Sequence, residues 1–350
     1  MQAGLECARP WERAGRAVGD GMRSGGARWA GLLLGLAVSA AALALAVRWA
    51  GWRPLREALV RVDLRFLLLG VAVFLISMMA RVASWRVLIG RPIGFGRVLA
   101  ALNEGYLLNN VLPWRMGELG RAILLGRQPG LSTPLVLSSI VVERLYDMIL
   151  AVGLMLVLLP VAAGAVWASR AAWIGAAVVG VALIFLGFAL RRPATVEGWV
   201  VRLPGPRAAW PRLWGSFRDG LAVLQTPQRL ALSFGWMAVS WGLALLEYWA
   251  VLRAVLPAAQ PLWAAFMLAA TLLGVAVPSL PGYVGVFEAA GVAALSVFGV
   301  APDQGLAAAL VLHGMVYSIA SLIGAVALVL DGETLTGLYR QTREWLATAA

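Results

Sequence analysis

Residues 103–121, with the sequence NEGYLLNNVLPWRMGELGR, have the composition of a binding site for a polar ligand. The stretch lies between long apolar segments, yet it contains two carboxylates, two arginines, three asparagines, one proline and three glycines. Lipid tails cannot satisfy such groups, and ionisable residues at membrane depth are costly and usually functional. We therefore interpret the stretch as a site and not as a connecting loop.

Within this stretch, Arg115, Glu118 and Arg121 follow an i, i+3, i+6 spacing. On a helix this spacing would place the carboxylate between two guanidinium groups, within ion-pairing distance of both. Arginine can bind two phosphate oxygens at once, and the start of a helix at Pro113 would add a favourable dipole. The motif predicts a phosphate site that Glu118 neutralises when it is empty. The alternative is an interfacial cluster of salt bridges.

Four further polar residues of the same stretch are assigned to this site: Asn103, Glu104, Asn109 and Asn110. A second charged motif follows, VVERLYD, which contains Glu143, Arg144 and Asp147. Glu143 and Asp147 are four residues apart and share a helix face, and Arg144 can pair with Asp147. These acids could relay a proton, or they could neutralise the arginines of residues 103–121; the two interpretations are compatible.

Residues 278–288, PSLPGYVGVFE, resemble the first stretch in kind, because a proline-glycine break precedes an acidic residue in an apolar segment. The glycines would let the backbone bend and approach a ligand or a neighbouring helix. A structural kink is the preferred explanation for the prolines and glycines, but it does not explain Glu288.

His313, Tyr317 and Ser321 recur every four residues along the last apolar segment. We assign His313 and Tyr317, together with Glu288, to a proton or charge relay. The alternative is a histidine that only hydrogen-bonds a neighbour inside the membrane. Glu247 and Tyr248 lie toward the outer end of the preceding long apolar segment, where a position at the interface would account for the acid.

The elements that position these residues are expected to be membrane helices. The 350 residues are 61% hydrophobic and 13% charged, and the mean hydropathy is +0.83. A soluble domain with a polar surface is therefore excluded. All 29 basic residues are arginine, and they lie mostly between apolar runs, which is typical of charges held on one side of a membrane and not of a nucleic-acid binder.

Six spans are expected at residues 31–47, 64–88, 135–160, 173–190, 230–252 and 306–330. Two further stretches, residues 98–127 and 263–300, are interrupted by proline and glycine, and each predicts a broken hairpin that either re-enters or crosses the membrane. The arginine clusters place both termini in the cytoplasm. The order span, span, hairpin, span then occurs twice with opposite starting sides, which indicates an inverted repeat at the level of segment order.

The expected organisation is a basic N-terminal segment at residues 1–29, a transmembrane domain at 30–330 and a cytoplasmic tail at 331–350. Met22 is an alternative start to Met1. Residues 31–47 are interpreted as an uncleaved first span and not as a signal peptide. Residues 49–65 predict an amphipathic helix on the membrane surface. One cysteine and one histidine make a His/Cys metal site unexpected, and we expect no cofactor.

The runs NEGYLLNNVLPWRMGELGRAILL, VVERLYD and SLPGYVGVFEAAG together resemble the lysylphosphatidylglycerol synthase transmembrane-region family. RVASWRVLIG, at residues 81–90, is similar to the Arg- and Trp-rich end of the family's second helix. The resemblance covers about residues 30–330. It implies a flippase-like membrane protein, and it places Arg115, Glu118 and Arg121 at the polar centre of a lipid path together with the acids of VVERLYD. Full-length synthases continue into an aminoacyl-transfer domain, so synthase activity is not expected here.

The residues and the resemblance lead to one expectation, a carrier in the plasma membrane that moves an anionic or zwitterionic phospholipid, or a polyprenyl-phosphate-linked lipid, between leaflets. No Walker A loop is present, so the energy would come from an ion or lipid gradient or from a partner. The alternatives are an intramembrane headgroup transferase and an accessory subunit of a lipid-modifying synthase. Membrane lipids are the expected partners, with a second copy or a lipid-modifying enzyme as further candidates, and nucleic acid is not expected.

Overall fold

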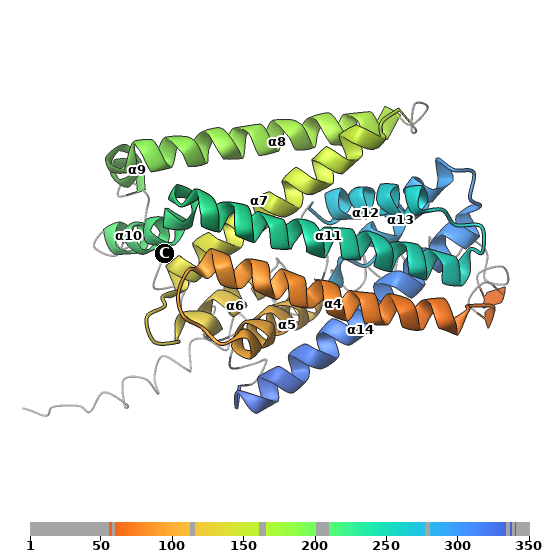
Figure 1. Ribbon diagram of the computed structural model, residues 1–350, viewed down its shortest axis with the longest axis horizontal. Helices are drawn as coiled ribbons and strands as arrows, with labels where there is room; N and C mark the ends of the chain where they lie inside the picture. The colour runs from red at the N-terminus through yellow and green to blue at the C-terminus, as the bar shows by residue number, and fades with distance from the viewer. Residues whose placement is uncertain are drawn as a thin grey trace, which may run out of the picture.

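The computed structural model describes residues 56–57, 60–112, 116–160, 166–200, 210–276, 281–333, 337 and 340. The elements formed by these residues are α-helices and two short 3-10 helices, with no strand among them. The predicted all-helical membrane bundle is therefore confirmed (Figure 1). The predicted first span at residues 31–47 lies outside the described residues, as does most of the predicted surface helix at 49–65.

The helices follow one another along the chain with short connections. In order they are α4 Leu64–Ile89, α5 Phe95–Val111, α6 Met116–Gly126, α7 Thr133–Leu158, α8 Val166–Arg191, α9 Pro193–Val200, α10 Trp210–Gly220, η2 Leu221–Gln225, α11 Pro227–Val255, α12 Pro261–Ala276, η3 Pro281–Tyr283, α13 Val286–Ser296 and α14 Pro302–Leu330. Side-chain caps begin two of them, since Asp63 accepts a hydrogen bond from the Arg65 amide and Ser132 accepts one from the Leu135 amide.

Four helices, α4, α8, α11 and α14, are long and apolar enough to cross a membrane. They correspond to the spans predicted at residues 64–88, 173–190, 230–252 and 306–330. The span predicted at 135–160 is found as the 26-residue helix α7, which carries the charged residues of VVERLYD in its interior. The arginine-rich connection at residues 191–229 contains α9 and α10, two short helices that hydropathy alone does not reveal.

Both interrupted stretches form pairs of short helices, α5 with α6 and α12 with α13. Helices α6 and α13 have 11 residues each, and at about 1.5 Å per residue they extend about 16 Å. The hydrocarbon layer is about 30 Å thick, so the helix lengths favour hairpins that re-enter over hairpins that cross. In the second hairpin the bend occurs where Gly282 and Gly285 have φ angles of 68° and 87°, which other residues rarely adopt.

Helices α4 and α11 pack antiparallel along most of their length and form the centre of the bundle (Figure 1). At their crossing, the Ser77 hydroxyl donates to the Ser240 carbonyl at 2.9 Å, and the Ser240 hydroxyl donates to the Ser77 carbonyl at 3.1 Å. This reciprocal pair has the symmetry that a two-fold axis between the halves would produce.

The contacts between the hairpins and the last long helix of each half are also related by this two-fold symmetry, because each contact in one half has an equivalent contact in the other. The first arm of each hairpin packs on the last long helix of the opposite half, α5 on α14 and α12 on α7. The second arm packs on the last long helix of its own half, α6 on α7 and α13 on α14. The described helices therefore support the inverted repeat that the order of segments predicted.

Gly324 allows the close approach of α14 to α5, because an added Cβ would lie 2.3 Å from the Asn103 carbonyl oxygen. We expect Gly324→Ala to lower the free energy of unfolding by about 1–3 kcal/mol, since backbone atoms cannot rotate away from the methyl group. Thermal unfolding in mild detergent measures the effect. Gly180→Ala on α8 is the control, because a Cβ there meets no atom within 4 Å. Equal midpoints for the two variants would contradict the packing.

Candidate functional site

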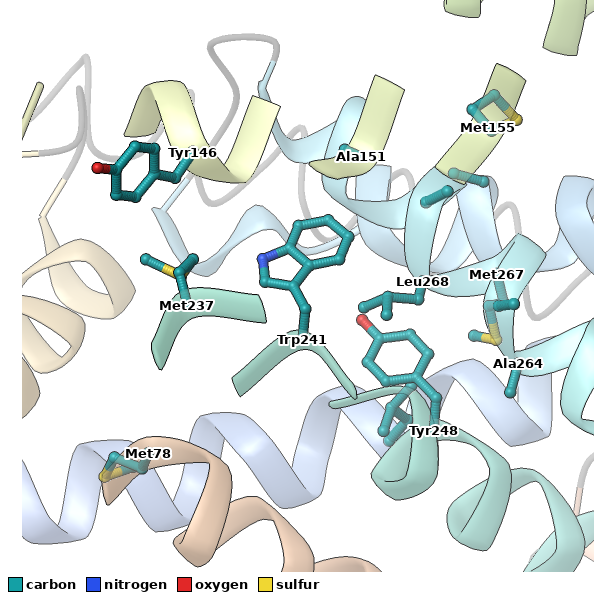
Figure 2. Close-up of a cluster of buried hydrophobic side chains, with 14 of the residues drawn as sticks. Met78, Tyr146, Ala151, Met155, Met237, Trp241, Tyr248, Ala264, Met267 and Leu268 are labelled. Carbon is teal, nitrogen blue, oxygen red and sulfur yellow. The ribbon is translucent and has the colours of Figure 1, made fainter. Parts of the chain in front are cut away.

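A cavity of about 260 Å³ lies beside the crossing of α4 and α11, with Ser77 and Ser240 in its wall. Both hairpins contribute to its lining, together with α7 and α14. Trp241 and Tyr248 project into this region from α11 (Figure 2). The charged residues that line the cavity are Arg81, Glu118, Arg121, Arg144, Asp147 and Glu247. The bundle thus encloses a polar space among apolar helices.

Arg81 of α4 holds the two acids of α7 together. Its Nη2 lies 2.7 Å from Oδ1 of Asp147, and its Nη1 lies 3.1 Å from Oδ2 of the same carboxylate and 2.8 Å from Oε1 of Glu143. The indole Nε1 of Trp241 donates to Oδ1 of Asp147 at 3.1 Å. A bidentate pair with a further donor fixes the carboxylate orientation. The predicted common face of Glu143 and Asp147 is therefore confirmed.

Arg121 of α6 is almost completely buried, with 2% of its surface exposed. Its Nη2 lies 3.0 Å from Oε2 of Glu143, and its guanidinium carbon lies 4.5 Å from the ring centre of Trp85. None of its three guanidinium nitrogens makes a hydrogen bond of good geometry to any described residue. Arg121 is therefore a lining residue whose buried guanidinium has unused donors and is stabilised by an ion pair and an aromatic face.

Arg144 and Glu118 are the most accessible members of the charged cluster. Their side chains are 35% and 24% exposed, and Arg144 Nε lies 3.7 Å from Glu118 Oε1. Arg144 also contacts Glu143 at 2.9 Å and Asp147 at 3.3 Å, which confirms the predicted i, i+3 pair. The contact with Glu118 is the longest in the cluster, so it is the contact that a ligand would displace most easily.

The predicted ion pair between Glu118 and Arg121 is wrong. Glu118 pairs with Arg144, while Arg121 points away from it toward Glu143 and Trp85. The physical reason is that the acids of α7 lie deeper in the bundle and offer the buried guanidinium a closer partner. Arg115, the remaining member of the predicted motif, lies outside the described residues.

Arg81 is not among the predicted site residues, because the sequence places it in the Arg- and Trp-rich end of the span at residues 64–88. It lies eight residues before Ile89 at the end of α4, about 12 Å along the axis at 1.5 Å per residue. This distance from the helix end is the feature of the sequence that indicates a buried role for Arg81. An arginine placed two turns inside a span requires an acidic partner within the bundle.

The asparagines of the first hairpin and Glu104 divide into two groups. Asn109 and Asn110 line the cavity, and the Asn109 side chain accepts a hydrogen bond from the Gly117 amide at 2.9 Å. Asn103 is buried and donates to the Leu99 carbonyl, and Glu104 is buried with Oε2 3.9 Å from Arg97 Nη1. Neither Asn103 nor Glu104 is part of the cavity lining, so the structure places them behind the predicted site.

The predicted relay residues of the second half lie together. Nδ1 of His313 is 2.6 Å from Oε1 of Glu288, and the Gly285 amide donates to Oε2 of Glu288 at 2.6 Å. The Tyr317 hydroxyl donates to the Asn110 carbonyl at 3.1 Å, and the Asn110 side chain donates to the Ser321 hydroxyl at 2.8 Å. The stripe on α14 thus connects the second hairpin to the first.

Glu247 is buried inside the bundle and does not face its outer surface. Only 3% of its surface is exposed, and it lines the cavity beside Tyr248, whose hydroxyl shares a hydrogen bond with Thr271 at 3.1 Å. The difference arises because α4 and α12 cover this end of α11. Among the described residues, no three His, Cys, Asp or Glu side chains come together as a metal site.

The fold and the cavity define a polytopic helical membrane protein with a charged internal site. The chain matches the family model described as "Lysylphosphatidylglycerol synthase TM region" over residues 32–324, and it therefore belongs to this family. No curated protein and no solved structure matches the chain. The family is a membrane region of lipid-modifying and flippase-like proteins, which agrees with the class that the resemblance implied.

We expect Arg81→Met to lower the free energy of unfolding by about 3–5 kcal/mol, because it leaves buried carboxylates without their closest cation. Thermal unfolding in detergent gives the measurement. Arg218→Met on α10 is the matched control, since Arg218 is exposed and distant from the cavity lining. Replacing Asp147 by Leu in the Arg81→Met background is expected to restore part of the loss. An Arg81→Met protein as stable as the control would show that the cluster does not hold the bundle together.

Proposed function

We propose that this protein is a lipid translocase that moves an anionic or zwitterionic phospholipid, or a polyprenyl-phosphate-linked lipid, between the two leaflets. The headgroup would occupy the cavity while the acyl or prenyl chains remain in the surrounding lipid. Membership of the lysylphosphatidylglycerol synthase TM region family supports a role in lipid biology. The particular substrate chemistry is argued from the cavity itself.

The observation that carries this proposal is the state of Arg121. Arg121 is part of the cavity lining, its side chain is shielded from bulk water, and its guanidinium nitrogens make no hydrogen bond of good geometry among the described residues, although Nη2 is in ion-pair contact with Glu143. Unused donors of a buried guanidinium are costly, and a phosphate oxygen pair is the acceptor whose geometry and charge suit them. A phosphate in the cavity would therefore gain more from Arg121 than water would.

Charge balance supports a site that is stable when empty and able to accept an anion. Three guanidinium groups of the cluster face three carboxylates, and the loosest of their contacts joins Arg144 to Glu118. When a phosphate arrives, Glu118 can turn away from Arg144 while Glu143 and Asp147 keep the arginines in place. The buried acids thus position the arginines, and the accessible acid exchanges with the ligand.

The two hairpins are proposed to have different roles. The first, α5 with α6, supplies Arg121, Asn109 and Asn110 to the cavity, whereas the second supplies aromatic side chains, Tyr283 and Phe287, and no arginine. We propose that the first hairpin holds the headgroup and that the second opens and closes the path. The hydrogen bond from Tyr317 to Asn110 lies between them and would break when the path opens.

We further propose that the protein lies in the plasma membrane with both termini in the cytoplasm. The support is the distribution of arginine, which concentrates in residues 191–229 and again at Arg340 and Arg343. With this orientation the first hairpin enters from the cytoplasmic side. Its headgroup site would then be loaded from the inner leaflet.

Transport by the purified protein in proteoliposomes tests the proposal. We expect Arg121→Lys to reduce the initial rate of movement of a fluorescent phospholipid by about 10- to 100-fold. The reason is that losing one or two charge-assisted hydrogen bonds costs about 1.5–3 kcal/mol. Lysine keeps the positive charge but not the planar fork that matches phosphate. Quenching of the outer-leaflet label by an impermeant reductant follows the movement.

Arg218→Lys is the control for this experiment, because it makes the same substitution on the exposed surface of α10. Elution as a single species and an unchanged unfolding temperature show that each variant is folded. If Arg121→Lys moves lipid at the wild-type rate, the cavity is not the headgroup path.

A further inference from the structure

Glu247 is a buried carboxyl group in the cavity wall that has no polar partner among the described residues. Its Oε1 is fully enclosed, and no described residue donates a hydrogen bond to the side chain or forms an ion pair with it. Every other acid lining the cavity is paired, since Glu118 contacts Arg144 and Asp147 contacts Arg81. Glu247 therefore stands apart from the arginine cluster.

The surroundings of Glu247 explain why it is unpaired. The cavity lining includes apolar side chains from three helices that pack around α11, with Phe74 from α4, Leu268 and Leu272 from α12, and Val316 from α14. The charged and titratable groups that face the cavity are Arg81 on α4, Tyr106 on α5, Glu118 and Arg121 on α6, Arg144 and Asp147 on α7, Tyr248 on α11, Tyr283 on η3, and His313 and Tyr317 on α14. No arginine or histidine nitrogen of this group lies within 4.0 Å of a Glu247 oxygen. The arginines contact Glu118, Glu143 and Asp147 instead, and His313 contacts Glu288.

Burial decides the charge of Glu247 in this conformation. Placing an isolated ionised carboxylate in an apolar environment costs several kcal/mol, and no cation here offsets that cost. Glu247 therefore carries a proton and is neutral in this conformation. The proton leaves when water or a cation in the cavity solvates the carboxylate.

We propose that Glu247 is a proton-binding site, and that release and uptake of its proton couple lipid movement to the proton gradient. On release, the Oε–H bond breaks, the electron pair stays on the carboxylate, and the proton passes to water in the opened cavity. On uptake, water on the other side of the membrane returns a proton. This inference rests on the proposed lipid translocation and adds its source of energy.

The coupling follows from electrostatics in the shared cavity. The arginine cluster is already balanced by its own acids, so an ionised Glu247 gives the cavity a negative charge that repels an anionic headgroup. A protonated Glu247 removes this repulsion, which is stronger in a low-dielectric interior than in bulk water. Headgroup and proton therefore favour each other's binding, which is the thermodynamic requirement for moving them together.

The protonation of Glu247 can be measured without any transport assay. Infrared difference spectroscopy of the purified protein at pH 7, wild type minus Glu247→Gln, is expected to show the carbonyl stretch of one protonated carboxylic acid. Asp219→Asn is the matched control, because it removes an exposed acid from α10 and is expected to leave that band in place. If the wild-type protein lacks the band, the proton site is overturned whether or not the protein moves lipid.

Proteoliposomes with an imposed pH gradient test the coupling. The wild-type rate of lipid movement is expected to change by up to about tenfold per pH unit, in opposite directions for opposite gradients, because one proton is linked to each headgroup. Glutamine has the shape of protonated glutamate but cannot release a proton. The rate of lipid movement by the Glu247→Gln protein is therefore expected to be independent of the gradient. The Asp219→Asn protein should respond as the wild type does.

The outcomes separate this inference from the proposed function. A wild-type protein that moves lipid equally well with and without a gradient overturns the coupling and leaves lipid translocation standing. A Glu247→Gln protein that still responds to the gradient overturns the role of this residue. A wild-type protein that moves no lipid under any gradient overturns translocation and, with it, the coupling.

Discussion

The rest of the structure depends on the pairing of charges that have been removed from water. Arg81, Arg121 and Arg144 lie among apolar helices, where an isolated guanidinium would be too costly to retain. Glu143 and Asp147 offset that cost from α7, and the five side chains tie α4, α6 and α7 into one unit. A network of this kind adds little net stability compared with apolar packing, but it fixes where the arginines point. Their position is what makes an anion site conceivable at membrane depth.

Interrupted helices are the means by which such a site is reached. A continuous helix satisfies its own backbone and offers a membrane cavity only side chains, whereas a hairpin ends inside the bundle and brings turn residues to the cavity. Here the lengths of α6 and α13 favour re-entry over crossing, and their partners α5 and α12 pack on the last long helices of the opposite halves. The reciprocal Ser77–Ser240 hydrogen bonds place the pseudo-two-fold relation at the α4–α11 crossing, next to the cavity. A movement that exchanges the environments of the two hairpins would leave this crossing in place.

The halves share a plan but differ in charge. Arginines and their acids line the part of the cavity formed by the first half. The second half supplies aromatic rings, His313, which contacts Glu288 behind it, and Glu247, which has no polar partner among the described residues. The two halves thus pack similarly but present dissimilar side chains to the cavity. The proposed roles, phosphate binding in the first half and proton binding in the second, would act on one headgroup because both sets of side chains line the same cavity.

Hydropathy and the positions of proline and glycine determined the fold class, four of the spans, helix α7 and both interrupted hairpins, because these features depend on local composition and segment length alone. The motif VVERLYD likewise indicated a common face for Glu143 and Asp147, since helical spacing is a local property. Only the tertiary structure decided the partners. It joined Arg81 to acids more than sixty residues away, turned Arg121 from Glu118 toward Glu143, left Asn103 and Glu104 behind the site and buried Glu247 in the cavity wall. Such pairings depend on which helices pack together, and the spacing of residues along a single helix contains no information about its neighbours.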